Sequence, residues 1–176
     1  AGGRLLLKGE WAASRMRDDI ETRLSTDADR DWIRQRLDDG WGSHVIALRG
    51  VLVDVTDHAA LIAGEREGVL HFRRLDDTRC EIVTLEAFRT GRGIGTVLVE
   101  TLAAQALGDG FRQLVVVTTN DNLDALRFYQ ARGFRLHALR PGAVDAARRS
   151  LNPEIAPTGS YGLPIRDEIE LVRDLG

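Results

Sequence analysis

The chain has 176 residues and a formal net charge of −3 at pH 7, a length that suits one domain with its own core. The 24 basic and 27 acidic residues nearly balance, so the basic excess of a nucleic-acid-binding protein is missing. No apolar run approaches the roughly 20 residues that a transmembrane helix needs. The single cysteine, Cys80, excludes an internal disulfide and is expected to be a small buried residue. We therefore expect a cytoplasmic protein with no nucleic-acid or membrane partner.

The first residues show no convincing pattern. We expect residues 1–16 to form an N-terminal extension that is either disordered or foreign to the natural chain, since Met16 is the only methionine and could be the natural start. Residues 17–176 are expected to form the folded domain.

The first half of this domain predicts one helix and an antiparallel meander. Trp32, Ile33 and Leu37 recur at helical spacing, which predicts an amphipathic helix over 28–39. β-branched and apolar runs between turn residues predict the strands. These strands are 20–24, 45–48, 51–55, 61–63, 69–74 and 79–85, of which 45–48 and 51–55 form a hairpin.

The second half alternates strands and helices. Ile94, Leu98, Leu102 and Ala106 fall four residues apart and predict a helix over 94–107 with one apolar face. Further helices are expected over 122–132 and 141–151, and further strands over 114–118, 134–139 and 168–172. The fold class is therefore α/β, with a long loop over 152–164 of the kind that is often functional.

A glycine turn lies between the strand 79–85 and the helix 94–107. It reads Thr90, Gly91, Arg92, Gly93, Ile94, Gly95, Thr96. Such a turn can bind an anion, because the first helical amides have no internal partner and glycine lets a phosphate approach the backbone. The dinucleotide fingerprint lacks its third glycine and the P-loop lacks its lysine. A tight turn without a ligand remains the alternative.

One face of the helix 122–132 carries Asn122, Ala125 and Tyr129, which are spaced i, i+3 and i+7. Asn122 offers an amide, Ala125 leaves room for a ligand and Tyr129 offers a hydroxyl. Each also has an ordinary structural reading: Asn122 as a helix cap, Ala125 as close packing and Tyr129 as a core ring.

Together, these two motifs resemble the GNAT superfamily of N-acetyltransferases. The family turn is Gln/Arg-x-x-Gly-x-Gly/Ala, and the segment 90–95 fits except that Thr90 replaces the Gln or Arg. The family pattern Asn-x-x-Ala-x-x-Phe/Leu-Tyr, followed by Gly-Phe, matches 122–129 and 133–134 throughout. The resemblance implies a single-domain, mostly antiparallel mixed sheet with a splayed central strand pair and flanking helices.

The resemblance also implies a cosubstrate, acetyl-CoA, and the residues that hold it. The pantetheine arm would lie along the backbone of Val83, Thr84 and Leu85, and Asn122 and Ala125 would line the cofactor arm. The pyrophosphate would be bound by Thr90, Gly91, Arg92, Gly93, Ile94, Gly95 and Thr96. Tyr129 would lie near the thioester sulfur.

Acetyl transfer to an amine requires three groups. The departing thiolate needs a proton, and Tyr129 can give one because a tyrosine hydroxyl with a pKa of about 10 is protonated at neutral pH. A backbone amide near Leu85 would stabilise the carbonyl oxygen. We prefer Glu81 as the base that takes the amine proton through a water, with a structural salt bridge as its equal alternative. Glu86 is interpreted as a solvated turn acid, on the opposite face of the strand unless a bulge intervenes.

Two other functions remain open: a non-catalytic acyl-CoA sensor or regulatory module, and a different nucleotide-phosphate enzyme. The acceptor would be a small-molecule or peptide amine, bound by the first helix, 41–44, 160–162 and His71. The four histidines lack metal-ligand spacing, so no metal is expected. The acyl group could be acetyl or larger, and the protein a monomer or a homodimer.

Overall fold

The computed structural model describes residues 20–89 and 91–176, so the expected extension 1–16 and Thr90 lie outside the described residues. The chain divides into two compact units. Among the described residues, unit 1 holds 20–44, 54–114 and 175–176, and unit 2 holds 45–53 and 115–174.

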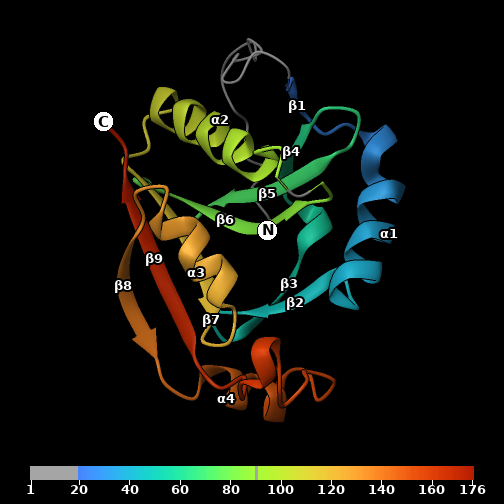
Figure 1. Ribbon diagram of the computed structural model, residues 1–176, viewed down its shortest axis with the longest axis vertical. Coiled ribbons are helices and arrows are strands. Elements are labelled where there is room, and N and C mark those ends of the chain that lie inside the picture. The colour runs from blue at the N-terminus through green and yellow to red at the C-terminus, as the bar shows by residue number, and fades with distance from the viewer. Residues whose placement is uncertain (1–19, 90) are drawn as a thin grey trace. The chain divides into compact units, whose positions relative to one another are not determined.

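Unit 1 is built on four strands in the order β1–β4–β5–β6, every neighbouring pair antiparallel (Figure 1). The strands are β1 (Thr22–Leu24), β4 (Ala59–Ala63), β5 (Gly68–Arg74) and β6 (Arg79–Ala87). They confirm the predicted strands and the antiparallel meander. β6 extends past the predicted end and contains Glu86. The interpretation of Glu86 as a solvated turn acid was therefore wrong.

Two α-helices belong to unit 1. The helix α1 (Arg30–Trp41) follows a short 3-10 turn, η1 (Asp27–Asp29), and ends at Gly42, whose φ of 76° is the left-handed geometry that favours glycine. A second 3-10 turn, η2 (Val55–Asp57), precedes β4. The helix α2 (Ile94–Gly108) contacts β4, β5 and β6. Its predicted apolar stripe from Ile94 to Ala106 is buried.

A β-bulge interrupts the pairing of β5 with β6. His71 is opposite Thr84, whereas Phe72 is opposite Ile82, so Val83 is an extra residue without a partner on β5. Beyond the bulge, the side chains of β6 again alternate between the two faces of the sheet, but the alternation is shifted by one residue.

The bulge decides which way the two glutamates of β6 point. Glu81 is opposite Arg73 and Glu86 is opposite Val69. Since Arg73 and Val69 are four residues apart on β5, both glutamates lie on the same face of the sheet. In an unbroken strand they would point to opposite faces.

Unit 2 contains the predicted hairpin, β2 (Val45–Leu48) and β3 (Val51–Asp54, whose last residue belongs to unit 1), and the strand order β7–β9–β8. These strands are β7 (Gln113–Thr119), whose first two residues belong to unit 1, β8 (Arg135–Arg140) and β9 (Glu168–Asp174). The helices are α3 (Leu123–Gln130), α4 (Ala143–Ser150) and the 3-10 turn η3 (Ser160–Gly162). The α/β class is confirmed, and the splayed strand pair stays a prediction.

Within 20–89 and 91–176, no helix combines the length and apolar character needed to cross a bilayer.

Candidate active site

The glycine turn has the backbone geometry of an anion cradle. Gly91 and Gly93 have φ values of 79° and 78°, and Gly93 is the N-cap of α2. A side chain is strained at such φ values. The first α2 amides therefore follow a turn that only glycine forms easily, and the helix dipole adds positive potential there.

Two arginines beside this turn share one carboxylate. Nη1 of Arg92 lies 2.9 Å from Oε1 of Glu67, and Nη1 of Arg89 lies 3.2 Å from the same atom. Sequence reasoning singled out Arg92 but missed Arg89 and Glu67. Adjacency to Thr90 could have indicated Arg89, whereas Glu67 is distant in sequence and gave no signal. The cluster keeps two guanidinium groups close to the expected phosphate position.

The bulged part of β6 carries a buried pair of polar side chains. Oγ1 of Thr84 lies 2.8 Å from Nδ1 of His71, and both residues are buried. Burial lowers the pKa of His71 to about 4, so its ring is neutral at pH 7. Its Nε2 has no hydrogen-bond partner among the described residues.

Glu81 is fully buried and forms an ion pair. Its Oε2 lies 2.7 Å from Nε of Arg73, the residue opposite it on β5. The structural salt bridge, which the sequence left as the alternative to a catalytic base, is therefore present. It engages the carboxylate that was predicted to act as the base.

Glu86 is placed differently. It is half-buried, and burial raises its pKa above the ordinary value. Glu86 forms no ion pair within 20–89 and 91–176, and it borders a pocket beside α1. Its combination of partial burial and access suits a group that exchanges a proton.

The predicted residues of unit 2 lie on α3. Oδ1 of Asn122 accepts a hydrogen bond of 3.1 Å from the amide of Ala125, so Asn122 caps the helix as its structural reading expected. Ala125 itself is half-buried.

Tyr129 is buried, and its ring makes edge contacts with Phe128 and Phe134 at centroid distances of 5.1 and 5.2 Å. Its hydroxyl forms no hydrogen bond within the described part of the chain. Burial raises its pKa well above 10, so it stays protonated at neutral pH.

The predicted site residues fall into two groups. Unit 1 brings together Glu81, the segment 83–85 and the glycine turn, whereas unit 2 carries Asn122, Ala125 and Tyr129. In the long loop, the hydroxyl of Tyr161 lies 2.7 Å from Oδ2 of Asp124, so this loop is tied to α3.

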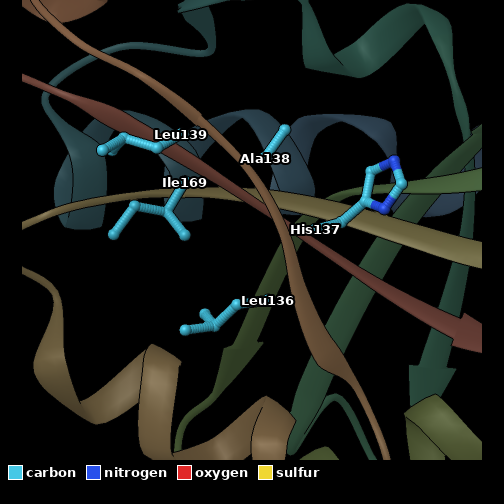
Figure 2. Close-up of a pocket in the computed structure, with 5 residues that line it drawn as sticks. All are labelled: Leu136, His137, Ala138, Leu139 and Ile169. Atoms are coloured by element: carbon cyan, nitrogen blue, oxygen red, sulfur yellow. The ribbon is translucent and has the colours of Figure 1, made fainter.

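A further pocket of about 270 Å³ lies on β8 and β9 of unit 2. Figure 2 shows Leu136, Leu139 and Ile169 gathered together, with the His137 ring on the other side of the β8 trace. His137 is the one titratable residue in its lining, so we assign no chemistry to this pocket. No group of three or more potential metal ligands occurs in 20–89 and 91–176.

The family model described as the acetyltransferase (GNAT) family matches residues 11–134, and the chain belongs to this family. Two relatives from Bacillus subtilis (strain 168) are similar in sequence. The uncharacterized protein YdhI is 36% identical over 133 residues, which is 73% of this chain and 82% of YdhI. The uncharacterized protein YxbD is 41% identical over 100 residues, which is 57% of this chain and 62% of YxbD.

Solved structures share the fold. A GNAT family acetyltransferase from Elizabethkingia anophelis, with acetyl-CoA bound, superimposes with a TM-score of 0.65, covering 90% of this chain and all of that one at 20% identity. The acetyltransferase yncA from Salmonella typhimurium, with acetyl-CoA, gives a TM-score of 0.62 at 18% identity, covering 90% and 95% of the two chains.

Proposed function

We propose that this protein transfers an acetyl group from acetyl-CoA to the primary amine of an acceptor. The observation that carries this is the glycine turn. Its two left-handed glycines open α2 directly after a bulged strand, within a chain of the GNAT family. Solved relatives of the same fold contain acetyl-CoA, which supports this donor.

The proposed binding uses the residues expected from the sequence. The amides of the turn hold the pyrophosphate, with Arg92 as a charged partner. The backbone of 83–85 holds the pantetheine arm, and the bulge at Val83 supports this because it leaves that residue outside the pairing with β5. Asn122 and Ala125 border the cofactor arm.

The proposed reaction is direct attack. The neutral amine attacks the thioester carbonyl, a C–N bond forms and the C–S bond breaks. The thiolate takes a proton from Tyr129, whose buried hydroxyl stays protonated at neutral pH. The proton that the nitrogen loses on amide formation restores this hydroxyl through solvent. An amide near Leu85 stabilises the oxyanion.

Two carboxylates on one face of β6 are candidates for the base. Glu81, which the sequence favoured, is engaged by Arg73 at 2.7 Å and would act through a water. Glu86 borders an open pocket. Comparing the Glu81→Gln and Glu86→Gln variants identifies which glutamate is the base. Only the variant that lacks the base loses the ionisation that governs kcat/KM at low pH.

The function is tested by mixing the protein with acetyl-CoA and a panel of amines and following free thiol. The native protein adds little background, since its only cysteine, Cys80, is buried and burial raises its thiol pKa to about 12. Amine-dependent thiol release supports the enzyme. Tight binding of acetyl-CoA without thiol release from any amine would instead indicate a sensor.

A further inference from the structure

A pocket of about 360 Å³ in unit 1 lies between the end of α1 and the end of β6. It is lined by Arg36, Asp39, Gly40, Glu86, Ala87 and Phe88. This volume lies within the range of small-molecule sites. Glu86 directly follows Leu85, the residue proposed to stabilise the oxyanion, so the pocket adjoins the part of β6 that the proposed reaction uses.

Glu86 is the half-buried one of the two acidic residues that line this pocket, the other being the exposed Asp39. It projects from the sheet face opposite to α2, since its partner Val69 alternates with Gly68, whose missing side chain faces Ile94. A Cβ at Gly40 would lie 3.0 Å from Oε1 of Glu86. The helix therefore approaches the carboxylate closely.

Arg36 is the cationic group. Its guanidinium carbon lies 4.8 Å from the centre of the Phe88 ring, and Phe88 in turn contacts Trp32 edge-on at 5.9 Å. This distance is that of a cation–π contact between the guanidinium and the ring. Arg36 forms no ion pair with any described residue, so its donors are available to a ligand.

The pocket thus presents one cation, Arg36, and two carboxylates, the half-buried Glu86 and the exposed Asp39; Arg36 and Glu86 form no ion pair within the described chain. A simple alkylammonium would meet Glu86 but also the unfavourable charge of Arg36. A dianionic ligand would be repelled by Glu86 and by Asp39. The ligand that satisfies both groups carries an ammonium and a carboxylate, and planar guanidinium groups bind carboxylates in a bidentate manner.

We propose that the acceptor is a free α-amino acid, held in this pocket with its carboxylate on Arg36 and its amino group on Glu86. The inference rests on the proposed acetyl transfer and specifies its substrate class. Glu86 takes the proton from the ammonium, and the resulting amine attacks the thioester. The C–N bond forms as the C–S bond breaks, and the thiolate is protonated by Tyr129. The proton that the nitrogen loses on amide formation passes through solvent and restores the tyrosine hydroxyl. Asp39 on the lining disfavours acidic side chains.

The test compares each of the standard L-amino acids as acceptor, and then compares the best one with its primary amide. The amide keeps the amino group and loses the carboxylate. For the wild type, we expect kcat/KM for the acid to exceed that for the amide. In Arg36→Gln, the acid-to-amide ratio should fall about 10- to 100-fold, as expected for losing hydrogen bonds between charged groups.

The control is Arg34→Gln, which removes an exposed arginine of the same helix that does not line the pocket and should leave the ratio unchanged. Calorimetric titration of the amino acid into the protein with CoA gives a readout independent of turnover, and Arg36→Gln should weaken it by a similar factor.

Two results would overturn the inference while leaving acetyl transfer intact: the amide being as good an acceptor as the acid, or thiol release occurring only with amines that lack a carboxylate. Absence of thiol release with every amine would instead refute the proposed function on which the inference rests.

Discussion

Gly40 of α1 makes room for the carboxylate of Glu86 on β6. A Cβ at Gly40 would lie 3.0 Å from Oε1 of Glu86, which is closer than a carboxylate oxygen normally approaches a methyl group. Glu86 would therefore have to move.

Replacing Gly40 by Ala should separate stability from activity. The free energy of unfolding should stay equal or rise by up to about 1 kcal/mol, because Ala is the better helix former. Displacement of Glu86 should lower kcat/KM for the acceptor roughly 10-fold, a smaller effect than the loss of a general base. Urea unfolding and steady-state kinetics measure both. Gly108→Ala, where a Cβ meets nothing within 4 Å, is the matched control and should keep its activity.

Replacing Gly93 by Val should abolish CoA binding. The φ of 78° at this N-cap strains any β-branched residue, and the added side chain would occupy the proposed phosphate position. We expect the Kd for CoA to rise at least about 100-fold, as expected when several hydrogen bonds to charged groups are lost, and calorimetry measures it. Gly142→Val carries the same strain at the N-cap of α4, where φ is 69°, and should leave CoA affinity unchanged. Unchanged binding in Gly93→Val would contradict the proposed cradle.

Replacing Tyr129 by Phe should slow turnover without destabilising the fold. The ring contacts with Phe128 and Phe134 are kept, and no hydrogen bond to a residue of 20–89 or 91–176 is lost. We expect kcat to fall roughly 100-fold, the usual size of a general-acid contribution, with the unfolding free energy changed by less than about 0.5 kcal/mol. Turnover within twofold of wild type would exclude Tyr129 as the acid.

His71 should make the protein less stable in mild acid. The folded-state pKa is lowered from 6.5 to about 4, so the unfolded chain binds a proton first as the pH falls. The contribution of His71 to the free energy of unfolding is therefore fully present above pH 6.5. It is lost as the pH falls from 6.5 to 4, which lowers the free energy of unfolding by about 3 kcal/mol. In His71→Gln this part of the decline should vanish. Urea unfolding at several pH values measures it, with the exposed His137→Gln as control; an unaltered pH profile in His71→Gln would contradict the prediction.

Asp29 should contribute stability that is present at neutral pH. Its carboxylate accepts hydrogen bonds from Arg23 at 2.6 and 2.8 Å, from the Thr26 amide at 3.0 Å and from Arg66 at 3.1 Å. These partners hold the pKa of Asp29 well below its ordinary value. Asp29→Asn should cost about 3 kcal/mol at pH 7. A lowered carboxyl pKa stabilises above the unfolded value, so the difference from wild type should shrink below about pH 4. A pH-independent difference would show that packing, not charge, is lost.

The sequence by itself determined most of the helices and strands, and it predicted the glycine turn as the place where the cofactor binds. Apolar residues spaced four apart predicted the helix α2. The glycines of the turn before it and Gly108 and Gly110 at its end predicted where it begins and ends, because these signals are local to the chain. Gly133, three residues beyond the last residue of α3, has a left-handed φ of 81°, which its residue type permits. The family resemblance rested on the same local segments.

Only the tertiary structure decided the face and the partner of each glutamate on β6. The bulge at Val83 depends on the register with β5, which no pattern within β6 reveals. Pairing with Arg73 engages Glu81, and Gly40 on α1 comes close to the half-buried Glu86. Alternation along an unbroken strand predicted the opposite geometry, because the direction of a side chain is fixed by pairing between strands and not by its sequence position alone.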